Sequence, residues 1–236
     1  MASPPRSPRP RDLRLQEYLA FARQRPDLFD VGEGGIRILL DSAEIEQVED
    51  DVTIDLRRRG LSETGAEIGI IAKDPWFWLI RDAVEFPDGA RRAYARFINR
   101  TGHGSAVLPL FEDRVMLTRQ FRHAIRRWSL EIPRGGIEID KTPDETAIAE
   151  VREEIGGEIT ELVPLGFVHG STNIYYNGVY LYFARLSRIG APQLSEGIIS
   201  IEQPTVAEFE RMLRDNEVTD SFTISAYFQA KLRGLV

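Results

Sequence analysis

Three glutamates near the middle of the chain have the spacing of a carboxylate cluster. Glu150, Glu153 and Glu154 stand at positions i, i+3 and i+4 of a segment with helical periodicity, which places them on one helix face. Like charges at this spacing repel by about 0.2–0.5 kcal/mol per pair, and the helix dipole disfavours the last two by about 0.3–1 kcal/mol each. A divalent cation would reverse both penalties, because Mg²⁺ prefers oxygen ligands together with water and substrate phosphate. The alternative is a solvated acidic face without a ligand.

The segment that carries the glutamates has helix signals at both ends. Thr142 suits the N-cap position, Pro143 suits the first helical position, and Glu145 completes a capping box. Gly156 and Gly157 are predicted to end the helix. The apolar positions predicted to face the core are Ile148, Val151 and Ile155.

The residues around this helix resemble the Nudix box, G-x5-E-x7-R-E-U-x-E-E-x-G-U, in which U is apolar. The matching positions are Gly135, Glu150, Val151, Glu153, Glu154 and Gly156. The flanking stretches "EIPRGG" and "LTRQFRH" resemble the "ELPAG" lead-in and the "VRQYRH" strand of ADP-ribose pyrophosphatase-like Nudix hydrolases. The resemblance covers approximately residues 74–235. It implies an α/β/α sandwich with a mixed sheet.

The resemblance also implies an activity, which is the metal-dependent hydrolysis of a nucleoside diphosphate linked to another moiety. ADP-ribose or another nucleotide sugar would give a nucleoside monophosphate and a phosphorylated product. Glu150 and Glu154 match metal-binding positions of the family, and Glu153 matches a position that binds metal or assists the attacking water. The carbonyl of Arg134 stands where a backbone ligand is often found. The implied cofactor is Mg²⁺ or Mn²⁺.

Other positions are expected to complete the site. By resemblance, a carboxylate after the box acts as a metal ligand or general base, with Glu196 as the first candidate and Glu202 as the second. Arg122 matches an arginine that contacts the substrate phosphates, and Arg119 lies on the same predicted strand. Arginine suits this role because its donors bind phosphate in pairs. Surface ion pairs are the alternative for both arginines.

Three aromatic residues precede the predicted catalytic core. Trp76, Trp78 and Tyr94 lie on two strands that flank the turn Pro87-Asp88-Gly89. Relatives use aromatics in such a hairpin to stack on the adenine, often with the hairpin exchanged between subunits. The resemblance therefore implies a homodimer, while core packing is the alternative role for each ring.

The chain departs from the family pattern at several positions. Lys141 replaces the first glutamate of the box, Ala149 replaces its arginine, and Gly157 stands where an apolar residue is usual. The S-P-G signal of ADP-ribose hydrolases is also missing, because the segment reads "VHGSTNIYYNG". Another nucleotide sugar or an unusual dinucleotide therefore stays open as the substrate. A catalytically weak Nudix domain that binds a nucleotide as a sensor or scaffold is the alternative function.

The order of predicted elements indicates an α/β fold with an N-terminal addition. Strand-like and helical segments alternate after residue 65, whereas two helical segments dominate before it. The predicted parts are a disordered tail over residues 1–12, a mainly helical extension over 13–65, a hairpin subdomain over 66–100 and a catalytic core over 101–236, the last two forming one Nudix domain.

Composition narrows the classes of partner. The net charge of −7 argues against nucleic-acid binding, and no apolar run reaches membrane-spanning length. The chain has no cysteine, which excludes disulfides and thiolate metal sites. We expect a cytoplasmic protein whose partners are a small-molecule nucleoside diphosphate and a second copy of the chain.

Overall fold

The structure is a computed structural model that describes residues 10–30, 32–194 and 197–236. The chain divides into two compact units, residues 1–100 and residues 101–236. No sheet is shared between the two units. No helix in the described ranges is long and apolar enough to cross a membrane.

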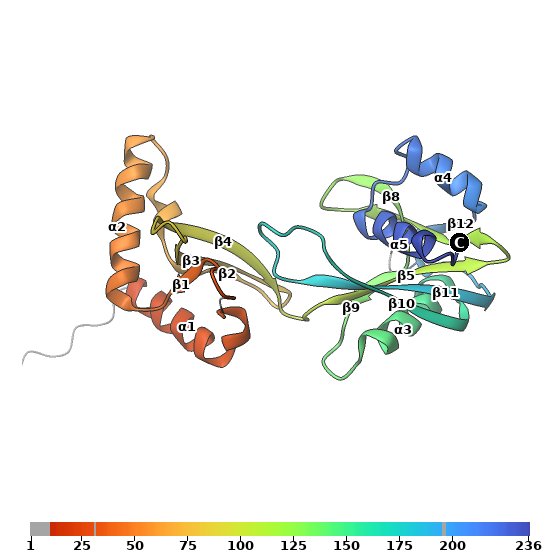
Figure 1. Ribbon diagram of the computed structural model, residues 1–236, viewed down its shortest axis with the longest axis horizontal. Helices are drawn as coiled ribbons and strands as arrows, with labels where there is room; N and C mark the ends of the chain where they lie inside the picture. The colour runs from red at the N-terminus through yellow and green to blue at the C-terminus, as the bar shows by residue number, and fades with distance from the viewer. Residues whose placement is uncertain (1–9, 31, 195–196) are drawn as a thin grey trace, which may run out of the picture. The chain divides into compact units, whose positions relative to one another are not determined.

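The first unit is an antiparallel sheet with two helices (Figure 1). Its helices are α1 (Pro10–Gln24) and α2 (Ser42–Arg58), with short 3₁₀ turns η1 (Pro26–Leu28) and η2 (Glu63–Ala66). Its strands are β1 (Arg37–Leu39), β2 (Gly69–Lys73), β3 (Phe77–Glu85) and β4 (Arg91–Asn99). The central strand is β3, which pairs with β4 along one edge and with β1 and β2 along the other. Helix α1 begins inside the segment predicted to be disordered.

A polar triad joins helix α1 of this unit to its sheet. The hydroxyl of Tyr18 on α1 donates to Asp82 on β3 at 2.6 Å, and Arg96 on β4 donates to the same carboxylate at 2.6 Å. Both Tyr18 and Asp82 are buried. The boundary predicted between residues 65 and 66 thus runs between helices and hairpin strands that share one core.

The second unit contains a mixed sheet and a smaller antiparallel sheet. The mixed sheet consists of β5 (Gly104–Phe111), β6 (Arg114–Val115), β9 (Arg134–Gly136), β10 (Glu158–His169) and β11 (Gly178–Arg188). Strand β11 runs parallel to β5 and antiparallel to β10. The smaller sheet has the order β12 (Ile198–Glu202), β7 (Leu117–Arg122) and β8 (Arg127–Glu131). The predicted α/β architecture with a mixed sheet is confirmed.

Helices cover both faces of the mixed sheet (Figure 1). They are α3 (Pro143–Ile155), α4 (Val206–Arg214) and α5 (Ser221–Leu232). Val151 and Ile155 of α3 pack in one hydrophobic core, whereas Phe209 of α4 and Tyr227 of α5 pack in the other. This layering places α3 alone on its side of the sheet.

Helix α3 has the predicted ends but a different buried stripe. Thr142 and Glu145 form the capping box, and Gly156 has a left-handed φ of 59°. Ile148 was predicted to face the core, but it is exposed, and Ala147 is buried instead. The prediction for Ile148 is wrong because the core contacts one row of positions spaced four apart, which runs through Ala147 and Val151 to Ile155.

Candidate functional site

Two of the three glutamates lie together on the inner side of α3. Glu154 is only 7 % exposed, and the negative charge of Glu150 acts on it. Burial, and then the charge of Glu150, raise the pKa of Glu154 to about 8, although Arg122 and the backbone of Arg134 oppose this shift. A buried carboxylate with this environment lacks sufficient positive charge from the protein.

Strand β9 lies directly against Glu150. A Cβ atom added to Gly135 would stand 1.9 Å from Oε1 of Glu150, so the carboxylate occupies the space that a side chain would need. Strand β9 is held in place by its pairing with β5, where Gly104 opposes Gly136. The glycine that opens the Nudix box therefore makes room for a helix carboxylate.

A network of charged groups lies beside the two glutamates. The buried carboxylate of Glu131 accepts from Arg122 at 2.5 Å and from Arg134 at 2.7 Å. Burial alone would raise the pKa of Glu131, but the hydrogen bond from Arg122 and the charge of Arg134 hold it below its usual value. Arg134 also pairs with Asp220 at 3.2 Å, and Asp220 caps helix α5 by accepting from Thr223. This network fixes the two arginines in place.

Sequence reasoning missed two members of this network, Glu131 and Asp220. Glu131 begins the stretch "EIPRGG", which the resemblance had already marked, and Asp220 immediately precedes a helical segment. Both positions carried a signal, but a sequence does not reveal that the two carboxylates share Arg134. The pairing depends on the fold, which brings the start of α5 beside β9.

The charges of the network fit a divalent cation. Its four carboxylates are Glu131, Glu150, Glu154 and Asp220, and its two guanidinium groups are Arg122 and Arg134. With all four carboxylates ionised, four negative and two positive charges would leave a formal excess of two negative charges, and the raised pKa of Glu154 reflects the cost of that state. In the described ranges no group of three His, Asp or Glu residues closes around a metal ion. Two carboxylates completed by water and phosphate oxygens would suit Mg²⁺.

Glu153 and Lys141 lie at the outer margin of this site. The side chain of Glu153 is 51 % exposed and forms an ion pair with Arg152 at 3.5 Å. Lys141 donates to Glu138 at 2.9 Å. That hydrogen bond, and then the charges of Glu138, Glu153 and Glu150, hold the pKa of Lys141 above its usual value. Lys141 thus replaces the family's first glutamate, and its positive charge acts on Glu138, Glu150 and Glu153.

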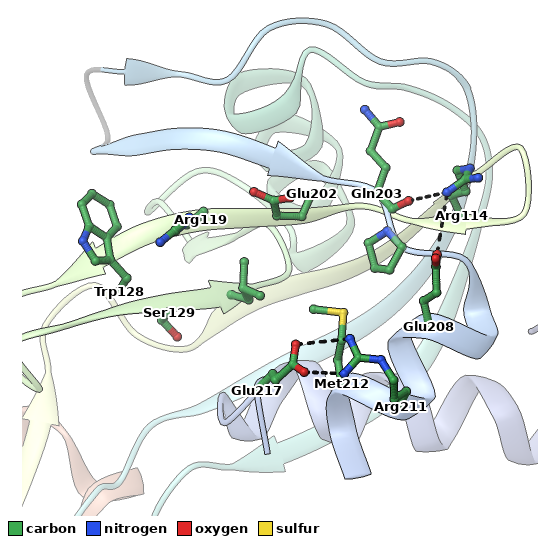
Figure 2. Close-up of a pocket in the computed structure, with 12 residues that line it drawn as sticks. Arg114, Arg119, Trp128, Ser129, Glu202, Gln203, Glu208, Arg211, Met212 and Glu217 are labelled. Carbon is green, nitrogen blue, oxygen red and sulfur yellow. Dashed lines mark hydrogen bonds and ion pairs between the residues drawn. The ribbon is translucent and has the colours of Figure 1, made fainter. Parts of the chain in front are cut away.

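The structure separates the two arginines that were predicted to bind phosphate. They are three residues apart on β7, so their side chains leave opposite faces of the strand. Arg122 points to Glu131 and the α3 carboxylates, whereas Arg119 lines a pocket beside α4 (Figure 2). Glu202 lines that same pocket, and Glu196 lies outside the described residues.

The three predicted base-stacking residues differ in their surroundings within the first unit. Trp78 packs on Phe21 of α1 with 4.5 Å between ring centroids, and the guanidinium of Arg100 lies over the Trp78 ring at 5.6 Å. Trp76 is 65 % exposed, and Tyr94 is also exposed. Core packing therefore accounts for Trp78, while Trp76 and Tyr94 keep open ring faces.

Comparisons with known proteins agree with the geometry. A family model described as the NUDIX domain matches residues 101–226, slightly more than half of the chain. The ADP-ribose pyrophosphatase of Bacillus subtilis (strain 168) is 28 % identical over 154 residues, which are 63 % of this chain and 82 % of that protein. The methanol dehydrogenase activator of Bacillus methanolicus is 24 % identical over 148 residues, 61 % of this chain and 80 % of that protein.

A solved structure described as an ADP compounds hydrolase has the same fold. It superposes with a TM-score of 0.62 at 20 % identity and covers 70 % of this chain and 91 % of its own chain. The predicted family resemblance and the predicted α/β fold are both confirmed by these matches.

Proposed function

This chain belongs to the Nudix hydrolase family, and from that premise we propose that it cleaves the diphosphate bond of a nucleoside diphosphate linked to another group. The substrate class that we propose is ADP-ribose or another nucleotide sugar, as suggested by the name of the Bacillus subtilis relative. The observation that carries this proposal is the pair Glu150 and Glu154, which stands beside the glycine of β9 with a formal excess of negative charge.

Nudix hydrolases generally use divalent metal ions, and we propose Mg²⁺ or Mn²⁺ here. When bound, such an ion would neutralise the diphosphate and lower the pKa of a water molecule. Glu150 and Glu154 would hold it, and the carbonyl of Arg134 is proposed as a further ligand. Glu153, at the exposed end of the helix, would orient the attacking water or bind a second ion.

The remaining roles follow from position. Arg122 is fixed by Glu131 beside the carboxylates, so it can donate to a substrate phosphate without losing its orientation. Trp76 and Tyr94 are proposed to stack on the base, and a loop carboxylate, Glu196, is proposed as the general base. Arg119 and Glu202 are left out of the substrate site because they line a different pocket.

The test is a screen of nucleotide sugars and dinucleotides with Mg²⁺ and with Mn²⁺, with the products separated by chromatography. We expect release of a nucleoside monophosphate by the wild type.

Titration of Mn²⁺ gives a readout that does not depend on turnover. The double substitution Glu150→Gln/Glu154→Gln should weaken Mn²⁺ binding strongly, whereas Arg152→Gln, a change on the exposed side of the same helix, should not. Equal Mn²⁺ affinities in the wild type and the double variant would contradict the assignment.

A nucleotide sensor or scaffold is the second candidate function. Its support is Lys141, whose charge acts on Glu150 and Glu153 in place of the family's glutamate, together with Ala149 in place of the arginine. Thermal stabilisation by a nucleotide without turnover by any metal would favour this function over hydrolysis.

A further inference from the structure

A separate pocket in the second unit lies between the smaller sheet and helix α4. Its volume is about 710 Å³, which falls within the range of roughly 300–1,000 Å³ that is usual for small-molecule sites. Figure 2 shows Trp128 and Arg119 at one end and the pair of Arg114 and Glu208 at the other, with Glu202 between them. These residues lie on the face of β7 opposite to Arg122.

Two of the three arginines in this pocket are already neutralised. Arg211 pairs with Glu217 at 2.5 Å. Arg114 lies 4.0 Å from Glu208 and donates to the carbonyl of Gln203 at 2.8 Å. These pairs leave their arginines with little capacity for a ligand, so they form the walls of the pocket.

Arg119 is the arginine that remains available. Within the described ranges its side chain makes neither a hydrogen bond nor an ion pair, and its guanidinium lies 5.6 Å from the centroid of the Trp128 ring. This cation–π contact orients the guanidinium while all of its donors stay free. Arginine uses such a planar set of donors to bind phosphate oxygens in pairs.

Trp128 supplies an open aromatic surface next to this cation. It is 47 % exposed, and Phe121 on β7 contacts it edge-on with 5.4 Å between ring centroids. The exposed ring is thereby fixed without being covered. Tryptophan and arginine are both enriched among the residues that contribute most of the binding energy at protein interfaces.

Glu202 provides an acceptor at a defined distance from Arg119. In the described ranges its side chain forms no ion pair and accepts only from the hydroxyl of Ser200, at 2.8 Å. Ser200 pairs with Arg119 across the sheet, and Glu202 stands two residues further along β12. The Cα atoms of such diagonal neighbours lie about 7–8 Å apart, which is close enough for two long side chains to contact one ligand. A ligand that contacts both side chains would carry an anion for Arg119 and a hydrogen-bond donor for Glu202.

We propose that this pocket binds a nucleoside monophosphate at a site distinct from the α3 carboxylates. The phosphate binds Arg119, the base stacks on Trp128, and the ribose hydroxyls or the base amino group donate to Glu202. No metal ion takes part in this binding. The inference does not depend on the proposed hydrolysis, because none of its residues belongs to the proposed substrate site.

The test is calorimetric titration of adenosine 5′-monophosphate into full-length protein carrying Glu150→Gln and Glu154→Gln, with a chelator present. We expect one molecule bound per chain. Arg119→Gln and Trp128→Leu should each weaken binding by about tenfold or more. Arg127→Gln changes an exposed arginine adjacent to Trp128 on the other face of β8, and it should leave the affinity unchanged. Trp128→Phe keeps an aromatic face and should retain part of the affinity.

Two further probes separate the parts of the site. Ribose 5-phosphate lacks the base and adenosine lacks the phosphate, so both should bind more weakly than the nucleotide. Absence of nucleotide binding, or binding that Arg119→Gln and Trp128→Leu both leave intact, would overturn the proposal. Equal affinities for ribose 5-phosphate and the nucleotide would also overturn it, because the base would then make no contact. Thermal unfolding of each variant checks that the fold is retained.

Discussion

At the scale of single residues, the contact between β9 and α3 depends on the absence of one side chain. We expect Gly135→Ala to lower turnover and Mn²⁺ affinity by about 10–100-fold, because the new Cβ would stand 1.9 Å from Oε1 of Glu150 and displace this carboxylate. Gly136→Ala is the matched control, since among the described residues its Cβ would meet the side chain of Thr101, with Oγ1 at 3.2 Å and Cβ at 3.8 Å. Mn²⁺ titration and initial rates measure both. Equal effects of the two substitutions would contradict the role of Gly135.

A second residue-scale prediction concerns the triad of the first unit. Tyr18→Phe removes one donor to the buried carboxylate of Asp82 and leaves Arg96 as the remaining side-chain donor among the described residues. We expect the free energy of unfolding to fall by about 1–3 kcal/mol at neutral pH, as measured by denaturant titration. Tyr94→Phe, at an exposed tyrosine of the same sheet, is the control and should change stability by less than about 0.5 kcal/mol.

The same substitution should change how stability depends on pH. Burial, and then the charge of Asp82, raise the pKa of Tyr18 far above its ordinary value of 10.0. The phenol then stays protonated in the folded state after the unfolded state begins to lose its proton. The stabilisation from Tyr18 is therefore complete below about pH 10 and is lost as the pH rises further, by about 1.4 kcal/mol per pH unit. The difference between wild type and Tyr18→Phe should narrow above pH 10, and a constant difference would contradict the prediction.

At the scale of elements, the sequence predicted those features that depend on local chemistry. The capping box at Thr142 and the end of α3 at Gly156 both follow from neighbouring residues, and the structure contains them. Strands β8 and β9 were not predicted, because two short, partly exposed strands have little periodicity.

In the candidate site, too, local spacing was predictable from the sequence and tertiary contacts were not. The spacing within α3 was sufficient to place Glu150 and Glu154 together. Glu153 shares the spacing but lies towards solvent, because the helix turns its inner side towards β9. The separation of Arg119 from Arg122 follows from strand alternation, yet which face meets α3 is decided by the packing of the two sheets. Partners from distant segments, such as Asp220, require the fold.

Helix α3 also carries a prediction about the lost pair of the Nudix box. Lys141→Glu alone adds a carboxylate beside Glu138, Glu150 and Glu153, and Ala149→Arg alone places a charge at a position that is only 8 % exposed. Each single change should lower stability, because each introduces a charge without its partner. The double variant should recover stability by at least about 0.5 kcal/mol over the sum of the single changes.

Turnover of the double variant shows whether Lys141 and Ala149 affect only the stability of the helix or also the reaction. If the altered pair only supports the helix, the double variant should keep wild-type turnover or raise it, and each single variant should do less. A double variant with lower turnover than both single variants would contradict this prediction. It would instead mark Lys141 as a residue that the wild-type site requires.

At the scale of the whole molecule, the sequence predicted that an N-terminal addition precedes a Nudix core. Its internal boundary was harder to place, because strands β3 and β4 resemble the later strands in composition. Long-range contacts, such as the pairing of β1 with β3 and the bond from Tyr18 to Asp82, reveal that the helices and the hairpin belong to one unit. Such long-range pairing leaves no periodic signal in the chain.

The exposed end of the hairpin predicts the oligomeric state. Trp76 and Phe77 are both exposed, and Phe97 on the neighbouring strand contacts Phe77 with 5.9 Å between ring centroids. Apolar rings gathered on a strand pair are an aggregation risk unless another surface covers them. We therefore expect a homodimer in which a second copy covers this end, and light scattering at micromolar concentration should give twice the chain mass of 26.8 kDa.

Trp76→Glu combined with Phe77→Glu should produce monomer, whereas Leu61→Glu, at an exposed apolar residue outside the hairpin, should leave the dimer intact. A wild type that is monomeric at this concentration would refute the prediction, and dimers that persist in the double variant would place the interface elsewhere.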